Sequence, residues 1–220
     1  MPSNPQKSAA DYRALAAAYD RRTRLIDAVR REAVAALELR PGDSVLDVGC
    51  GTGFCFAPVL DRIGPQGRLL AFDPSPDLLN QARARVAEAG WRNVELVESE
   101  AEAIRFAETR PAALLFSYTH DVLQSKAALD NLLGQAAAGA RVALCGSVLW
   151  PGWAWPLSVP VNAYLRATHR RYITNLENFD RPWAKIAPRL KDFRVARRGP
   201  GWRYLASGRL RGSGTQAIAR

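Results

Sequence analysis

The segment SVLDVGCGTGFC, residues 44–55, carries the residue types and spacing best suited to bind a ligand. It places glycines at three alternate positions, Gly49, Gly51 and Gly53, directly after an apolar run, with Asp47 two residues before the first. Glycines between a strand and a helix let a ligand approach the backbone N–H groups at the helix start with no side chain between them. The segment therefore predicts a nucleotide- or nucleoside-binding loop.

Two departures from phosphate-binding loops favour a nucleoside without phosphate. The dinucleotide-binding pattern requires a third glycine where Phe54 stands, and the Gly-Lys-Ser/Thr of a phosphate-binding loop is absent. Asp47 would repel a phosphate, whereas it would attract an ammonium or sulfonium group. We therefore predict a ligand that is a positively charged nucleoside.

Polar groups that suit the rest of a nucleoside follow the next two expected strands. Asp73 ends the strand at residues 68–73, where a carboxylate accepts hydrogen bonds from ribose hydroxyls in such folds. After the following strand, Glu100 could accept a hydrogen bond from an adenine amino group, and the Ala101 N–H could donate to the ring. These positions predict contacts to ribose and base.

The elements that must position these residues alternate along the chain. Amphipathic helices precede Pro41-Gly42, and apolar strands and helices then follow in turn. The expected strands span residues 44–48, 68–73, 93–98, 112–117 and 140–146, and the expected helices span residues 53–63, 75–90 and 128–138. This alternation predicts right-handed crossovers and an α/β, doubly wound, Rossmann-like sheet.

The last third of the chain departs from this alternation. A Trp- and Pro-rich segment, residues 149–160, precedes an expected helix at 161–172 and a short expected helix near Trp183 to Leu190. Expected strands at 193–198 and 202–210 are close enough to form a hairpin. We therefore expect a seven-stranded, mostly parallel sheet with an antiparallel C-terminal strand.

Together these motifs resemble the class I S-adenosylmethionine-dependent methyltransferases. They are D-x-G-x-G-x-G from Asp47 to Gly53, Asp73 followed by Pro-Ser-Pro, and the acid-Ala pair after the third strand. Within that family the chain is most similar, over about residues 19–146, to the type 11 group that includes quinone and phospholipid methyltransferases. The resemblance implies S-adenosyl-L-methionine as cofactor and S-adenosyl-L-homocysteine as product.

The resemblance also implies a role for each matching residue. At the methionine part of the cofactor, Gly49, Gly51 and Gly53 would line the site, Asp47 would reach the ammonium group through water, and Ser117 and Tyr19 would approach. Asp73 would bind the ribose. Pro74 would lie against the adenine, and Glu100 and Ala101 would contact the adenine edge. The family more often has Asp where Glu100 stands, and usually has Pro-Gly-Gly where residues 138–140 are Ala-Gly-Ala.

Candidates for catalysis lie in SYTHD, residues 117–121, at the carboxyl edge of the sheet. Methyl transfer from a sulfonium is an in-line displacement that needs alignment and, for a hydroxyl acceptor, removal of a proton. His120 could be the general base and Asp121 could orient it or contact the acceptor; alternatively, His120 packs under the cofactor or caps the next helix. The segment lacks the Asp/Asn-Pro-Pro-aromatic motif of base-amine enzymes, and Asp121 stands alone, so no metal is expected.

The type 11 resemblance implies a substrate lid after the fifth strand. We expect N-terminal cap helices at residues 1–40 and one methyltransferase domain at 41–220, with the lid at about 147–190. Trp150, Trp153 and Trp155 could wall an apolar acceptor pocket there, or they could form an ordinary core cluster.

The basic charge of the chain is concentrated in its C-terminal third. Residues 157–220 hold 14 Lys and Arg against 3 Asp and Glu, and Arg166, Arg170 and Arg171 could share one helix face. Such a face suits an anionic membrane surface, an acidic substrate or nucleic acid, or it is simply solvated. We do not expect nucleic acid as a partner, because no RNA-binding module is recognised.

Three cysteines without metal-ligand spacing and an N-terminus without signal-peptide features predict a cytoplasmic protein, with peripheral membrane contact as an alternative. The uncharged run at residues 142–165 is interrupted by Gly and Pro, so we do not expect a transmembrane helix.

The leading hypothesis is methyl transfer to a small or lipid-like, largely apolar acceptor. The alternatives are a phospholipid head-group N-methyltransferase at an anionic membrane, and an RNA-binding methyltransferase or non-catalytic nucleoside-binding regulator. The sequence specifies no oligomeric state.

Overall fold

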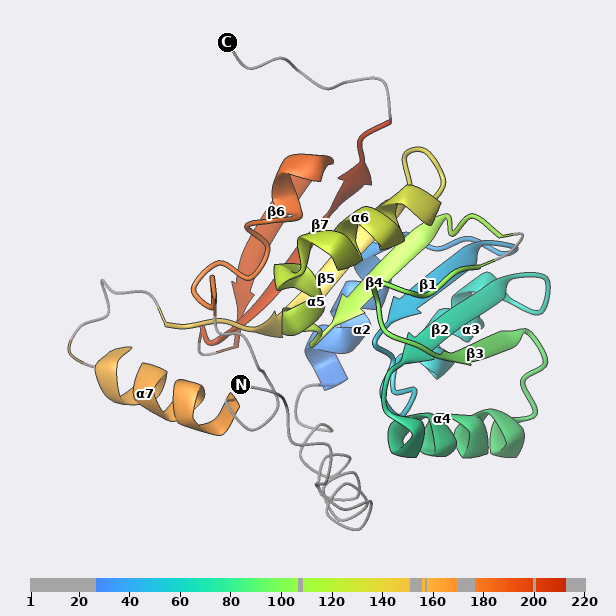
Figure 1. The fold of residues 1–220 in the computed structure, drawn as a ribbon, viewed down its shortest axis with the longest axis horizontal. Helices are drawn as coiled ribbons and strands as arrows, with labels where there is room; N and C mark the ends of the chain where they lie inside the picture. The colour runs from blue at the N-terminus through green and yellow to red at the C-terminus, as the bar shows by residue number, and fades with distance from the viewer. Residues whose placement is uncertain are drawn as a thin grey trace.

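A seven-stranded mixed sheet forms the centre of the computed structural model (Figure 1). The structure describes residues 27–106, 109–150, 156, 158–169, 177–199 and 201–212, so Tyr19, Trp153, Trp155, Arg170 and Arg171 lie outside the described residues. The strands are β1 (Ser44–Val48), β2 (Arg68–Asp73), β3 (Val94–Glu98), β4 (Ala113–Ser117), β5 (Arg141–Ser147), β6 (Leu190–Arg198) and β7 (Arg203–Leu210).

The strand order, β3-β2-β1-β4-β5-β7-β6, is that of a doubly wound sheet with a C-terminal hairpin added at one edge. The pairs β3·β2, β2·β1, β1·β4 and β4·β5 are parallel, whereas β7 is antiparallel to both β5 and β6. The expected fold class is therefore confirmed, including the antiparallel C-terminal strand.

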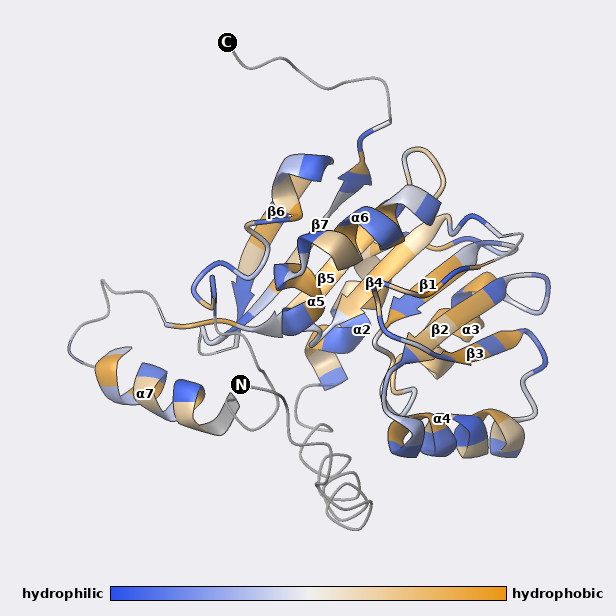
Figure 2. Cartoon of the chain, in the orientation of Figure 1, coloured by the Kyte–Doolittle hydropathy of each residue, from blue (hydrophilic) through white to orange (hydrophobic). Residues whose placement is uncertain are grey.

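Helices cover both faces of this sheet. The helices that cover it are α2 (Asp27–Ala36), α3 (Phe56–Ile63), α4 (Pro76–Ala89), α5 (His120–Gln124) and α6 (Lys126–Gln135). A further helix, α7 (Ser158–His169), stands apart from the sheet (Figure 1) and packs through Leu165 against Leu149 and Phe179. Buried side chains of α5 and α6 pack on one face, and those of α2, α3 and α4 pack on the other. The central strands are accordingly almost wholly apolar, as Figure 2 shows, because a sheet covered on both sides offers no solvated face.

The end of β2 and the start of α4 are fixed by local capping. The Ser75 side chain accepts a hydrogen bond from the Leu78 N–H at 3.4 Å, and Pro76 follows as the first helical residue. A serine N-cap contributes about 1 kcal/mol, and proline at this position sacrifices no helical hydrogen bond. These residues set where the chain turns after Asp73.

The structure differs from the expectation near Trp183 to Leu190, where no α-helix forms. The chain there makes turns and a short 3₁₀ helix, Ala187–Arg189, before β6 begins at Leu190. Pro188 has no N–H to donate and would clash with the preceding turn of an α-helix. The hairpin is longer than expected because Leu190 and Lys191 also pair with β7, and its register shifts between Lys191 and Arg194.

None of the helices within the described ranges has the length and hydropathy of a membrane-spanning segment.

Candidate functional site

The register of the parallel strands brings polar residues to one edge and one face of the sheet. Asp47 lies two residues after Val45, whose side chain packs against the helices on the α2 and α3 face. Ser117, the last residue of β4, pairs in register with Cys145, which also lies on that face. Since alternate residues of a strand share a face, Asp47 and Ser117 point to the same side at the carboxyl ends of their strands.

The glycines of the loop after β1 all have positive φ values, which residues with a Cβ rarely adopt: +59° at Gly49, +56° at Gly51 and +79° at Gly53. A Cβ on Gly49 would lie 2.7 Å from the Thr119 side chain, and one on Gly53 would lie 2.6 Å from the Phe56 ring. A Cβ on Gly51 meets no atom within 4 Å in the described part of the chain. Gly51 therefore borders open space that a ligand can use.

Asp73 holds the glycine loop against the end of β2. One carboxylate oxygen accepts the Gly51 N–H at 2.9 Å and the other accepts the Ser75 N–H at 2.9 Å. Burial raises the pKa of Asp73, and these two backbone N–H groups partly oppose that rise. Each carboxylate oxygen can accept more than one hydrogen bond, so the group can still receive a hydroxyl. The sequence predicted a ribose contact here and missed the contact to the loop.

Asp47 is a buried acid near the end of β1. Its side chain is 1% exposed, and neither carboxylate oxygen has a hydrogen-bond partner among the described residues. Burial raises the pKa of Asp47 to about 7; the nearby Arg30 charge opposes this rise and the Asp73 charge adds to it. A buried carboxylate is costly unless something pairs with it, which marks this acid as a position for a cationic group.

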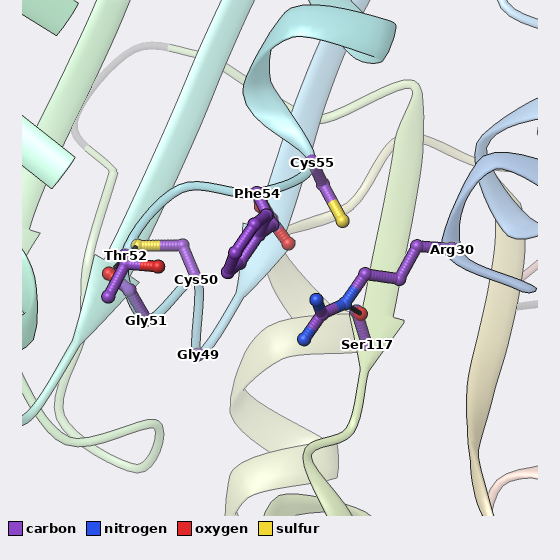
Figure 3. A pocket seen from close by; sticks show the side chains of 9 residues that line it. Arg30, Gly49, Cys50, Gly51, Thr52, Phe54, Cys55 and Ser117 are labelled. Atoms are coloured by element: carbon purple, nitrogen blue, oxygen red, sulfur yellow. Dashed lines mark hydrogen bonds between the residues drawn. The ribbon is translucent and has the colours of Figure 1, made fainter. Parts of the chain in front are cut away.

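Arg30 reaches the same site from α2, a helix outside the motifs recognised in the sequence. Figure 3 shows its side chain extending toward Ser117 and facing the Phe54 ring. Its Nε donates to Ser117 Oγ at 3.4 Å, and its guanidinium carbon lies 4.8 Å from the Phe54 ring centroid and 5.2 Å from that of Tyr118. The signal for Arg30 is its place on the buried stripe of α2, with Val29, Ala33 and Val34.

These groups enclose a small cavity of about 20 Å³, which is room for one water molecule. Its lining comprises Arg30, Asp47, Gly49, Cys50, Gly51, Thr52, Phe54, Cys55 and Ser117 (Figure 3). The three cysteines are free thiols, and burial raises the pKa of each, to about 11 for Cys145. At neutral pH the three thiols are protonated rather than nucleophilic, and Cys50 and Cys55 form part of the wall of the cavity.

Three other residues predicted from the sequence lie along the same sheet edge, outside that cavity. Pro74 is exposed directly after Asp73, Glu100 is exposed, and Ala101 is buried at 4% exposure. The Ser99 N–H donates to the Asp73 carbonyl at 3.3 Å, which keeps the segment after β3 beside the end of β2. This arrangement places them next to Asp73, where a base attached to a ribose would extend.

His120 begins α5 and is 7% exposed. Its Nε2 lies 3.0 Å from the Glu177 carbonyl oxygen, and its ring meets Phe179 edge-on at 5.1 Å between centroids. Because a carbonyl only accepts hydrogen bonds, Nε2 carries the proton of the neutral ring and Nδ1 carries the lone pair. Asp121 follows in the first turn of α5. The structure thus joins His120 to residues 177–179, whereas Asp47 and Ser117 share the cavity.

The chain resembles known methyltransferases in sequence and in fold. Residues 45–138 match a family model described as a methyltransferase domain. Aklanonic acid methyltransferase DauC of Streptomyces sp. is 35% identical over 36% of this chain and 36% of its own length. Demethylmenaquinone methyltransferase of Listeria monocytogenes is 34% identical over 36% of this chain and 33% of its own length. The matches thus span about a third of these relatives.

A solved structure extends the similarity to most of the fold. The SAM-dependent methyltransferase from Aquifex aeolicus superimposes with a TM-score of 0.57, covering 82% of this chain and 89% of that one at 21% identity. The order of strands, with a glycine loop after β1 and acids ending β2, is that of a Rossmann-like methyltransferase domain. These similarities support a class I S-adenosylmethionine-dependent methyltransferase domain of the type 11-like group over residues 45–138.

The residues present fit the cofactor of this family. The Asp47 carboxylate and Arg30 Nη1, neither with a hydrogen-bond partner in the part of the chain that the structure describes, line one cavity with Gly51. S-adenosylmethionine carries an ammonium, a carboxylate and a ribose, which are the groups that such a set of partners would bind.

Gly51→Ala should weaken binding of S-adenosylhomocysteine by about 10- to 100-fold, because the added methyl group occupies the open space beside the loop. Gly139→Ala is the matched control, since Gly139 also has a positive φ of +72° and an open surrounding but lies in the turn before β5. Each variant should lose about 1–2 kcal/mol of folding free energy through backbone strain. Calorimetric titration measures the affinity for S-adenosylhomocysteine, and chemical unfolding measures the loss of folding free energy. Equal affinities of Gly51→Ala and Gly139→Ala would contradict the place of Gly51 in the binding site.

Proposed function

We propose that this protein transfers the methyl group of S-adenosylmethionine to a small or lipid-like, largely apolar acceptor. The observation that carries the proposal is the buried Asp47 carboxylate, which has no hydrogen-bond partner within the described residues and lies beside the glycine loop. A cationic nucleoside is the ligand that would satisfy this acid.

Each part of the site would contribute binding and orientation. Asp47 would attract the ammonium group of the amino-acid part through a water molecule, and Ser117 would approach that part. Asp73 would accept from the ribose, and Pro74, Glu100 and Ala101 would contact the adenine. The bound cofactor supplies an electrophilic methyl group on a sulfonium, so the protein's task is to align the acceptor and exclude water.

The apolar character of the acceptor is supported by the residues beyond the end of β5. Leu149, Leu165 and Phe179 form a buried cluster against which Val161 and Trp202 pack. The His120 ring contacts Phe179, so this cluster adjoins the segment after β4 where an acceptor would lie. Apolar side chains at this place would offer an acceptor an apolar surface beside the polar groups of the segment after β4.

A second candidate, head-group N-methylation at an anionic membrane, is favoured by the outer surface of α7. Val159 is 48% exposed there, and Arg166, seven residues later and therefore on the same helix face, is also exposed. Apolar and basic side chains together on a helix surface suit contact with anionic lipid.

Transfer of a radiolabelled methyl group from S-adenosylmethionine tests these proposals. Three acceptor sets should be compared: polycyclic phenols and quinols, phosphatidylethanolamine vesicles with and without anionic lipid, and total RNA. Label in the phenol or quinol products supports the leading proposal, and label in phospholipid that requires anionic vesicles supports the second candidate. Label only in RNA, or saturable cofactor binding without transfer to any acceptor, would contradict both.

For a hydroxyl acceptor, we propose that His120 removes the proton through Nδ1 and that Asp121 contacts the acceptor. His120→Gln can still donate a hydrogen bond to the Glu177 carbonyl from its amide, but it has no basic nitrogen. Its melting temperature should therefore stay near that of the wild type, while methyl transfer to a phenol falls about 100-fold. His120→Ala should show the same fall in the rate of methyl transfer. It should also lose about 1–2 kcal/mol of folding free energy, because it cannot make the hydrogen bond to the Glu177 carbonyl. An unchanged rate in His120→Gln would leave His120 a purely structural residue.

A further inference from the structure

Three consecutive residues of a distant segment contact α5, the short helix that begins with His120. The Glu177 carbonyl oxygen lies 3.0 Å from His120 Nε2, and the Phe179 ring meets the His120 ring edge-on. Between these two residues, Asn178 Nδ2 donates to Gln124 Oε1 at 2.9 Å. Both contacts to the imidazole therefore depend on how this one stretch of backbone is turned.

The turn is made at Asn178. Its φ is +51°, in the left-handed region that residues with a Cβ rarely adopt, although asparagine adopts it more readily than most. Such a conformation persists where the surrounding structure fixes it. The hydrogen bond from Asn178 to Gln124 helps to fix this turn, and with it the direction of the neighbouring Glu177 carbonyl toward His120.

Gln124 is suited to hold this segment because it is buried and bonded at both ends of its amide. It is 5% exposed, and its Nε2 donates to the Pro182 carbonyl at 3.0 Å while its Oε1 accepts from Asn178. Its own backbone carbonyl, at the end of α5, accepts from Lys185 Nζ at 2.8 Å. Gln124 lies four residues after His120, so both side chains lie on one face of α5.

We infer that Gln124 is a positioning residue for methyl transfer: through Asn178 it directs the Glu177 carbonyl, which keeps the proton on His120 Nε2 and the imidazole in one orientation. This inference rests on the proposed role of His120 as base and deepens it. A hydrogen bond to one ring nitrogen of a histidine sets which nitrogen carries the proton. At metal sites, losing such a supporting partner lowers affinity or activity about 10- to 100-fold.

The segment has further anchors that keep it docked when the Gln124 amide is removed. The Leu149 N–H donates to the Phe179 carbonyl at 3.1 Å, and the Trp183 ring lies 5.0 Å from the Tyr204 ring between centroids. These anchors follow the turn, so they secure the segment without setting the direction of the carbonyl before it. Variants of Gln124 should therefore fold and differ from the wild type at the imidazole.

The first measurement observes the imidazole N–H of His120 by NMR and needs no acceptor. The chain has two histidines, so the loss of one signal in His120→Gln assigns it. In the wild type this N–H should be protected from exchange with water, because it is buried and bonded. The protection should be lost in Gln124→Met, and also in Asn178→Gly, in which glycine tolerates the positive φ but offers no amide to Gln124.

Asn93→Leu is the matched control, because it also removes two side-chain hydrogen bonds. Asn93 Nδ2 donates to the carbonyls of Gly64 and Gly67 at 3.0 Å and 2.8 Å. Asn93 directly precedes β3, so it lies at the amino ends of the parallel strands, opposite the edge that carries His120. This variant should keep the protected N–H signal and the wild-type rate of methyl transfer.

The second measurement is a double-mutant cycle on methyl transfer to a phenol at saturating S-adenosylmethionine. Gln124→Met should lower the wild-type rate about 10- to 100-fold. In the His120→Gln background the same change should alter the rate by less than about threefold, because a residue that acts through His120 has no further effect once the base is gone. The affinity of Gln124→Met for S-adenosylhomocysteine should stay within about threefold of the wild-type value.

Two results would overturn the inference. A protected His120 N–H in both Gln124→Met and Asn178→Gly would show that the imidazole is held without Gln124; if Gln124→Met fails to fold, Asn178→Gly alone decides this point. Equal rate losses for Gln124→Met in the two backgrounds would show that Gln124 supports the fold in general. A wild type that transfers no methyl group to a phenol would instead contradict the proposed function, and the N–H signals would still decide whether Gln124 positions His120.

Discussion

Asp47→Asn should lower the affinity for S-adenosylhomocysteine by about 1000-fold, the usual scale for removing one partner of a buried charge pair. The same variant, free of ligand, should be more stable than the wild type at pH 8. Asparagine has nearly the shape of aspartate but no charge, so it relieves the burial of a carboxylate that has no hydrogen-bond partner within the described ranges. Lower affinity together with higher stability distinguishes a ligand-binding acid from a structural one.

The raised pKa of Asp47 predicts how the stability of the wild-type protein changes with pH. Burial raises the pKa of Asp47 from 3.8 to about 7, so between these values the folded protein binds a proton that the unfolded chain releases. The free energy of unfolding should therefore fall as pH rises from about 4 to about 7, by at most about 4 kcal/mol, and level off above that. Asp47→Asn lacks this contribution.

Chemical unfolding of both proteins at pH 5 and pH 8 measures the difference. Asp77→Asn, a half-buried acid in the first turn of α4, is the control and should follow the wild type at both pH values. If Asp47→Asn and the wild type lose stability in parallel between pH 5 and pH 8, the Asp47 carboxylate is not the buried, unpaired group described above.

Asp73→Asn should also weaken cofactor binding, by several hundred-fold, but with the opposite effect on stability. The carboxylate accepts the N–H groups of Gly51 and Ser75, and asparagine offers only one accepting atom for these two donors. One buried N–H is then left facing another donor, at a cost of about 1–3 kcal/mol in folding free energy. The ribose loses charge-assisted hydrogen bonds of about 1.5–3 kcal/mol each, which gives the expected loss of affinity.

Calorimetry with S-adenosylhomocysteine and chemical unfolding separate the two consequences for Asp73→Asn, again with Asp77→Asn as control. A variant that loses stability but keeps wild-type affinity would make Asp73 a loop-fixing residue without a ligand contact. A variant that keeps its stability would contradict the two hydrogen bonds to the backbone.

The parts of this fold that the sequence predicts are those governed by local rules. Each central strand is a short apolar run, and the glycines after β1 lie where only positive φ values fit the turn. Asp73 could be placed because the strand that it ends was recognisable and parallel strands end at a common edge. The Ser75-Pro76 start of α4 follows from capping alone.

The features that the sequence did not predict depend on contacts between distant residues. Arg30 contacts Ser117 across 87 positions of sequence, and nothing in the local pattern of α2 indicates which cavity it enters. The loop-fixing hydrogen bond between Asp73 and Gly51 spans 22 positions. The early start of β6 depends on pairing with β7, which sets the strand ends regardless of local preference.

The measurement that tests the central claim most directly is calorimetric titration of the wild-type protein with S-adenosylhomocysteine at pH 6 and pH 7.5. We predict saturable binding at a single site, tighter at pH 7.5, because the Asp47 carboxylate must be ionised to bind the ammonium group and its pKa is about 7. Absence of saturable binding, or tighter binding at pH 6, would contradict the assignment of this site to a cationic nucleoside.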